Sequence, residues 1–210
     1  MQNKQIIESP DFISFDKTQE FFNDIVIHLD EDIREPKYYR YLFSELEGLT
    51  ENCTVRIRIN THGGYLEGAF AFLEAIQNTR ATVYAHIVGA CHSAGSLIAL
   101  SCPYISVGKN ASMMIHAPSY GTIGKTGEII NQTLHSTSQH EALFKDVYKD
   151  FLSETEIKDV LKGNDIWLNA EEISKRLENK FNPKKPRVKR AKAEAKPKEK
   201  ALKETAEIPT

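Results

Sequence analysis

The chain has 210 residues, of which 40% are hydrophobic and 27% charged, a composition that fits one soluble domain with tails. No apolar stretch is long enough to span a bilayer, and the N-terminus lacks the apolar core of a signal peptide, so we expect no membrane partner. Three cysteines without a CxxC pair exclude a disulfide framework and indicate a reducing, cytoplasmic setting.

The net charge of −2 hides an asymmetry between the body of the chain and its C-terminal end. Residues 183–210 hold ten Lys and Arg against four Glu, whereas residues 1–182 hold 17 basic and 25 acidic side chains. A segment of this composition cannot bury a core, so we predict a disordered basic tail. Its role is either solubility alone or binding to nucleic acid or an acidic partner.

The remaining chain is predicted to consist of a flexible leader (1–15) and one folded domain (16–182). Strands alternate with helices about every thirty residues, which is the βαβ signature of a parallel, layered α/β fold. The expected strands are 23–29, 55–60, 82–88, 104–108 and 112–116, with a compact link at 164–169. The expected helices are 30–46, 66–78, 93–102, 128–151, a short one opening at 153, and 170–177.

The stretch 89–96 joins a β-branched strand to a helix through small residues, which let the backbone turn sharply at Ser93. A serine at such an elbow has an open hydroxyl beside the free N–H groups of the first helical turn. That suits a nucleophile whose intermediate carries an oxyanion. Taken alone, however, the stretch favours a helix N-cap, a position that serine fills well.

Three further motifs stand in order around this serine. They are INTHGG at 59–64, MMIHAP at 113–118 and DIWLNAEE at 165–172. Together with 89–96 they resemble the patterns INSPGG, GxxASxG, MIHxP and DxxxxAEE of the Clp protease (ClpP) family of serine peptidases. The resemblance covers roughly residues 23–178, and four motifs in the correct order are specific where each one alone is weak.

The resemblance implies a fold and a catalytic triad. The fold is a crotonase-like, layered βαβ spiral with a protruding handle, formed by a strand and the long helix from Glu128. The triad is Ser93 as nucleophile, His116 as general base and Asp165 as the residue that holds the imidazole tautomer. The context of Asp165 is the least specific of the three, because Asn-Asp is also an ordinary turn pair.

The resemblance also assigns the groups around the triad. The oxyanion hole would be the backbone N–H groups of Gly64 and Ala94. The substrate would pair as an added β-strand with the glycine-rich segment 119–127. The implied substrate-binding residues are Gly63, Tyr65, Gly121, Thr122, Ile123 and Gly124.

The implied activity is hydrolysis of extended polypeptides inside stacked rings of seven subunits, without metal or organic cofactor, in an ATP-dependent process. However, Arg56 and Arg58 replace the tyrosines that help receive an apolar loop of the AAA+ Clp ATPase, which makes that partner uncertain. Thr61 and His62 replace Ser-Pro, so the glycine turn is expected to be looser. With these departures the chain resembles the Clp-like proteases of bacteriophages, some of which process capsid proteins during head maturation.

Two other functions remain open at this stage. A crotonase-like peptidase of the signal-peptide-peptidase type would use a Ser-Lys dyad, with Lys109 or Lys125 as the base. A ring-forming paralogue without catalytic turnover would keep the fold and lose the activity.

The residues near the serine are expected to have structural roles. His92 is predicted to be a pocket or structural residue because its side chain points away from Ser93, and Cys91 a small buried residue. A metal site built from His62, His86 and His92 matches no ligand spacing, so no metal is expected.

Overall fold

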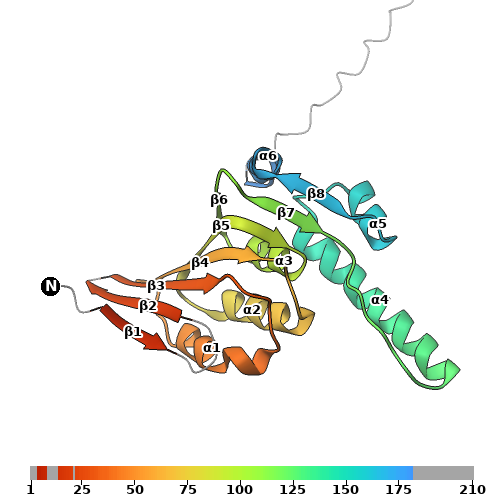
Figure 1. Ribbon diagram of the computed structural model, residues 1–210, viewed down its shortest axis with the longest axis horizontal. Coiled ribbons are helices and arrows are strands. Elements are labelled where there is room, and N and C mark those ends of the chain that lie inside the picture. The colour runs from red at the N-terminus through yellow and green to blue at the C-terminus, as the bar shows by residue number, and fades with distance from the viewer. Residues whose placement is uncertain (1–3, 9–13, 21, 182–210) are drawn as a thin grey trace, which may run out of the picture.

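The computed structural model describes residues 4–8, 14–20 and 22–181. Its eight-stranded sheet has the order β1-β2-β3-β4-β5-β7-β8, with β6 also paired to β5 (Figure 1). The strands are β1 (Lys4–Glu8), β2 (Ser14–Glu20), β3 (Phe22–Leu29), β4 (Thr54–Thr61), β5 (Thr82–His92), β6 (Tyr104–Val107), β7 (Ser112–Ile115) and β8 (Ile166–Asn169). The helices are η1 (Pro36–Tyr39), α1 (Arg40–Glu47), α2 (Leu66–Asn78), α3 (Ala94–Ser101), α4 (Thr126–Tyr148), α5 (Glu154–Leu161) and α6 (Ala170–Phe181).

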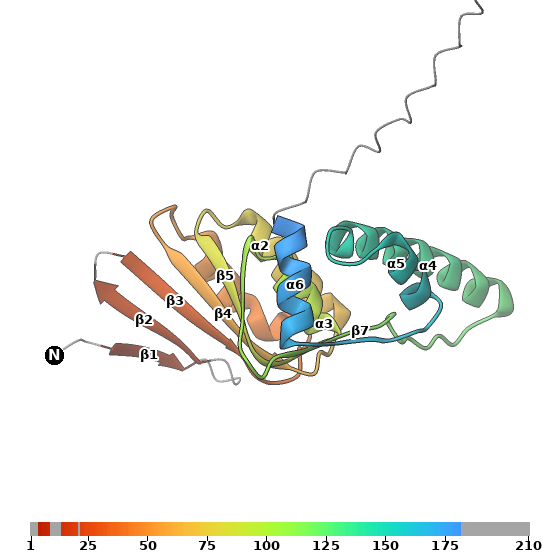
Figure 2. The same ribbon diagram turned by 90° about the horizontal axis from the view of Figure 1, so that it is seen from above.

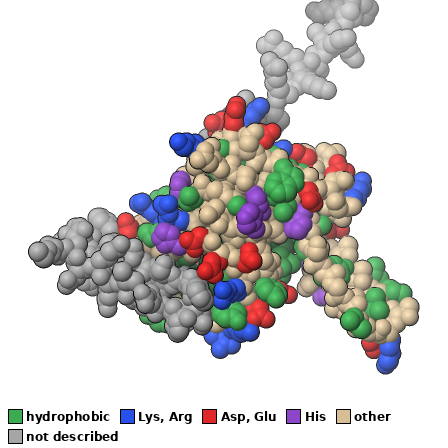
Figure 3. All heavy atoms as spheres, viewed as in Figure 1, with side chains coloured by type: hydrophobic (Ala, Val, Ile, Leu, Met, Phe, Trp, Pro, Cys, Tyr) green, Lys and Arg blue, Asp and Glu red, His purple; other side chains and the backbone are tan. Residues whose placement is uncertain are grey.

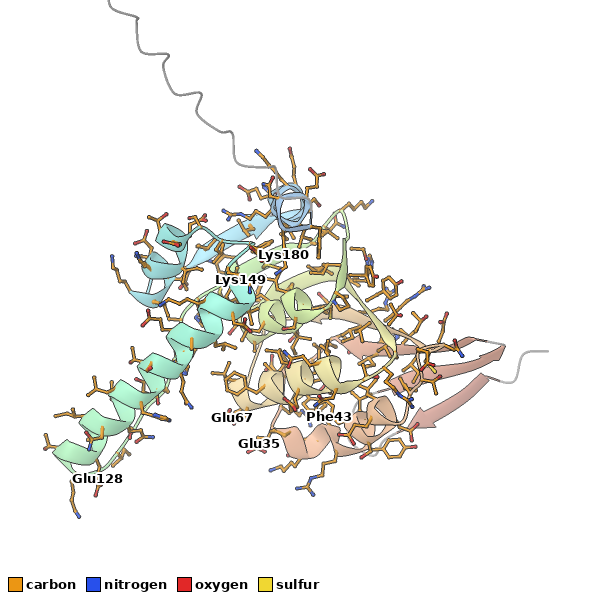
Figure 4. All side chains as sticks on the ribbon, turned by 180° about the vertical axis from the view of Figure 1, so that it is seen from behind. Glu35, Phe43, Glu67, Glu128, Lys149 and Lys180 are labelled. Carbon is orange, nitrogen blue, oxygen red and sulfur yellow. The ribbon has the colours of Figure 1, made fainter. Side chains whose placement is uncertain are left out.

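The centre of the sheet is parallel, which confirms the predicted α/β class. Strand β4 pairs in parallel with β3 and β5, and β5 pairs in parallel with β6 and β7. Along β4 the side chains alternate: Ile57 and Ile59 are buried, whereas Arg56 and Arg58 are exposed. The buried side chains meet α1, α2 and α3, which cover one face of the sheet (Figures 2 and 4).

The two edges of the sheet differ from the predicted parallel fold. At each edge the strands pair in the antiparallel direction. Strands β1 and β2 form a hairpin on β3 where the sequence predicted a flexible leader, and residues 1–3 and 9–13 of that leader lie outside the described residues. At the other edge, β8 pairs with β7 in place of the predicted link. Four residues are too few for a periodic signal, and only pairing with β7 makes them a strand. The predicted basic tail also lies outside the described residues.

The first predicted helix begins later than expected. The sequence predicts a helix over 30–46, but the chain is irregular up to Glu35, and regular helix begins with η1 at Pro36. Proline restricts the residue before it to extended backbone, and Glu35 has φ −61° and ψ 152°. Pro36 itself suits the first turn, where its missing N–H is not needed.

The long helix α4 projects from the body, with Glu128 near its outer end and Lys149 just beyond its inner end (Figure 4). Only its inner end is buried, at Phe144, Val147 and Tyr148. The Tyr148 hydroxyl lies 2.7 Å from the Ser96 hydroxyl, which anchors α4 to α3. Residues 116–125, where a handle strand was expected, form no strand within this chain.

A partly buried ion pair joins the last two helices. Arg176 in α6 donates to both carboxylate oxygens of Glu156 in α5, at 2.7 and 3.2 Å. Glu156 also completes a capping box with Ser153, which confirms the predicted opening of that helix. The hydrogen bonds from Arg176 lower the pKa of Glu156 to about 2.

This ion pair is expected to contribute stability that is lost in acid. Because the pKa of Glu156 lies below its ordinary 4.5, the contribution is complete above pH 4.5 and disappears as the pH falls toward 2. The carboxylate is about one-third exposed, so after solvent screening we expect about 1 kcal/mol. The free energy of urea unfolding, measured from pH 7 to pH 2.5, should fall less in Glu156→Gln than in wild type. Glu154→Gln in the same turn is the matched control, and equal acid sensitivity of wild type and Glu156→Gln would contradict the assignment.

Candidate active site

Ser93 forms the elbow between β5 and α3. It has φ 53° and ψ −124°, and no other non-glycine residue in the described parts of the chain has a positive φ. A residue held in such a region costs about 1–3 kcal/mol, and this strain is typical of functional sites. The backbone N–H of Ser93 donates to Met114 O at 2.8 Å, which fixes the elbow against β7. Its side chain makes no capping bond to α3, in contrast to the N-cap expectation.

The Ser93 hydroxyl is instead hydrogen-bonded to His116. The distance from His116 Nε2 to Ser93 Oγ is 2.7 Å, and both side chains are half-buried. His116 follows directly after β7, and the parallel pairing of His92 with Met114 brings it beside the elbow. A histidine at this distance can accept the hydroxyl proton.

Asp165 lies near this pair without contacting it. Strands β7 and β8 pair Ile115 with Ile166, so the next position along the antiparallel ladder sets Asp165 opposite His116. Asp165 is exposed, and no hydrogen bond to His116 is found among the described residues. The fold therefore brings two of the three expected triad residues into contact and sets the third at a neighbouring sheet position.

The glycine turn packs directly behind the serine. A Cβ atom on Gly63 would lie 2.6 Å from Ser93 Cβ, and Gly63 has φ 109°. The turn is joined to Ile33, whose N–H donates to Gly63 O at 2.7 Å and whose carbonyl accepts from Tyr65 N at 2.8 Å. This pairing does not use the N–H of Gly64.

Both residues that replace Ser-Pro in the turn make hydrogen bonds. The Thr61 hydroxyl donates to Glu31 O at 2.6 Å and accepts from Gly63 N at 3.1 Å. His62 Nδ1 lies 3.2 Å from His92 Nδ1, so the second substituted residue also has a partner. These bonds hold the turn in the absence of Ser-Pro, and its expected looseness stays a prediction.

A cavity of about 760 Å³ opens beside the serine on the helix side of the sheet. Ser93, His116, Gly64 and Ala94 line it, together with apolar side chains such as Phe144. Of the six expected substrate-binding residues, Tyr65 and Gly121 line the cavity. The other four do not: Gly63, Thr122, Ile123 and Gly124. The side chain of Ile123 is fully exposed.

His92 is held in a hydrogen-bonded chain that sequence reasoning did not find. Its Nδ1 atom meets His62, and its Nε2 atom lies 2.9 Å from the Ser112 hydroxyl. Burial and the neighbouring His62 lower the pKa of His92. The sequence offered one signal for this contact: His62 lies in the glycine turn, and His92 directly precedes Ser93 in the elbow. His86 lies elsewhere, bonded to Ser106, and no group of three metal-ligating side chains occurs among the described residues.

The other candidate groups are not at the serine. Cys91 is fully buried, and burial raises the pKa of its thiol, which disfavours a thiolate nucleophile. Lys125 pairs with Glu128 at 3.6 Å near the outer end of the handle. Lys109 lies exposed in the turn between β6 and β7.

A strained serine at a strand-to-helix elbow, bonded to a histidine and next to open amides, is the arrangement of hydrolases with a serine nucleophile. A family model described as Clp protease matches residues 11–176. The chain belongs to the Clp protease family and is a peptidase. A comparison with curated proteins returned no match. In the described part of the chain, no helix combines the length and apolar character needed to cross a bilayer.

Proposed function

We propose that this protein is a serine endopeptidase in which Ser93 attacks the scissile carbonyl and His116 is the general base. The 2.7 Å contact between His116 Nε2 and Ser93 Oγ is the observation that carries the proposal. His116 would take the hydroxyl proton as the Ser93 oxygen bonds to the carbonyl carbon. It would then give that proton to the leaving amine as the peptide bond breaks.

Two backbone N–H groups are the proposed oxyanion hole. Ala94 is the first residue of α3, so its N–H has no partner within the helix. Gly64 lies outside the hydrogen bonds that join the turn to Ile33 and lines the same cavity as Ser93. Both amides would stabilise the negative oxygen of the tetrahedral intermediate.

Asp165 is the proposed third member of the triad. Its sheet position opposite His116 supports the assignment, since directly opposed residues of an antiparallel ladder are close enough for their side chains to interact. The carboxylate would fix the tautomer in which Nε2 accepts the serine proton.

The proposed substrate is an extended polypeptide, bound in the cavity beside residues 119–121. By family resemblance the protein would act as stacked heptameric rings in the cytoplasm, and by resemblance to bacteriophage members it would process capsid proteins. The proposal includes no ATPase partner, because the exposed Arg56 and Arg58 oppose an apolar docking loop. The basic tail would bind nucleic acid or an acidic partner.

Labelling with a fluorophosphonate probe tests the nucleophile and its base. We expect an adduct on Ser93, located by mass spectrometry, that is absent in Ser93→Ala and strongly slowed in His116→Ala. Asp165→Asn should slow labelling less than His116→Ala does, because Asp165 acts through the histidine. Labelling that survives His116→Ala would support the Ser-Lys alternative, and no labelling of an assembled ring would support the inactive paralogue.

A further inference from the structure

Three aromatic rings form a continuous surface beside the active site, which we call the ring shelf (His62, His92 and Trp167). The centroids of the two imidazole rings lie 5.1 Å apart. Trp167 meets His92 edge to face, also at 5.1 Å, with an interplanar angle of 73°. Trp167 is 61% exposed and His62 is exposed, so two of the three rings are open to a ligand.

The sheet register puts the shelf next to the reacting pair. Met114 in β7 is paired with His92 on one side and with Trp167 on the other. His116 lies two residues beyond Met114, just past the end of β7, so its position is about 6.7 Å along the chain direction from that of Met114. His92 also directly precedes Ser93 in the chain.

The shelf and the cavity lie on opposite faces of the sheet. The cavity is lined by helix residues such as Leu97 and Phe144. In the strands the core side is taken by Cys91, Met113 and Leu168, so the alternate, mutually paired positions of His92, Met114 and Trp167 lie on the other face. Figure 3 shows histidine side chains gathered on that open face around a hydrophobic one. Because His92 directly precedes Ser93 and Met114 stands two residues before His116, the shelf adjoins the reacting pair, and a polypeptide bound across that pair can extend from the cavity toward the shelf.

We propose that the ring shelf is a substrate subsite for an aromatic side chain, on the side of the scissile bond away from the cavity. The inference rests on the proposed peptidase function and adds a substrate preference to it. Aromatic rings pair best edge to face or offset-stacked, and the open faces of Trp167 and His62 offer such pairing. The hydrogen bonds of His92 to His62 and Ser112 fix the central ring, so the shelf is preorganised.

Matched peptides test the preference. Internally quenched peptides with alanine throughout are compared with peptides that carry one phenylalanine, scanned across the positions on both sides of the cleaved bond. In wild type we expect kcat/KM to rise about 2- to 10-fold for phenylalanine at one position on the far side of the bond. In Trp167→Leu this phenylalanine-to-alanine ratio should fall to about one.

Tyr104→Leu is the matched control, because Tyr104 is an exposed aromatic residue, 52% accessible, on the same sheet but away from the shelf. It should leave the ratio as in wild type. Each ratio is taken within one protein, so a general loss of folded enzyme cancels. A wild-type ratio near one at every position, or a ratio that Trp167→Leu leaves unchanged, overturns the subsite.

A binding readout separates this inference from the catalytic one. Trp167 is the only tryptophan in the chain, so its emission reports on the shelf alone. An unlabelled phenylalanine peptide should change that emission in Ser93→Ala, and the all-alanine peptide should not. If wild type neither reacts with the fluorophosphonate probe nor hydrolyses peptides but the emission responds, the peptidase proposal is overturned. The ring shelf is then a binding site for an aromatic side chain and not part of a catalytic site. If wild type hydrolyses peptides and the emission does not respond, the aromatic subsite is overturned and the peptidase proposal stands.

Discussion

Replacing His116 by alanine is expected to lower peptide hydrolysis by about 10⁴-fold, because the serine loses the base that takes its proton. The 2.7 Å bond to Ser93 Oγ is the one polar contact that joins the two side chains, and among the described residues no lysine lines the cavity at the serine to replace it. Initial rates with an internally quenched peptide measure the effect. The residual rate should rise with pH, since hydroxide can then deprotonate the serine.

Two comparisons make this prediction specific. Ser93→Ala combined with His116→Ala should be no slower than either single variant, because the two residues act as one unit. His86→Ala removes another histidine of the same sheet, bonded to Ser106 and not to the site, and should retain full activity. A His116→Ala enzyme within tenfold of wild type would show that another group is the base.

The sequence predicted the parallel centre of the sheet well because its strands carry strong local patterns. Val55 to Asn60 alternates apolar and polar residues, and the structure buries every second one. The four residues of β8 and the N-terminal hairpin have no such pattern, since their strand character depends on the neighbours they pair with. Local signals therefore fail at the two edges of the sheet.

The contact between Ser93 and His116 was predictable for a different reason. Ser93 and His116 each stand in a motif, and the order of the motifs along the chain implied that the two residues are in contact. The number of residues between them could not have implied this contact. The contact between His62 and His92 had no such support, because the two residues are 30 positions apart, one just after β4 and the other at the end of β5. Only the β4–β5 pairing, with its irregularity between Ile59 and Thr61, brings these rings together.

Replacing Gly63 by alanine is expected to have the second large effect. The added Cβ would lie 2.6 Å from Ser93 Cβ, 3.0 Å from His92 O and 3.2 Å from Ala94 N. Two of these atoms belong to the backbone of the elbow and cannot rotate away, and φ 109° is itself unfavourable for alanine. The elbow or the turn must move, which would displace both the proposed nucleophile and the proposed oxyanion amides. We expect about 2–3 kcal/mol of destabilisation and about a 100-fold loss of labelling of Ser93.

Gly127→Ala is the matched control for this substitution. Gly127 lies in the first turn of α4, and a Cβ there meets nothing within 4 Å. Alanine is the better helix former by about 1 kcal/mol, so this variant should be as stable as wild type or more so. Urea unfolding gives the stability, and the rate of fluorophosphonate labelling gives the integrity of the site. If Gly63→Ala labels at the wild-type rate, the turn does not hold the serine in place, and its close packing against the elbow is incidental to reactivity.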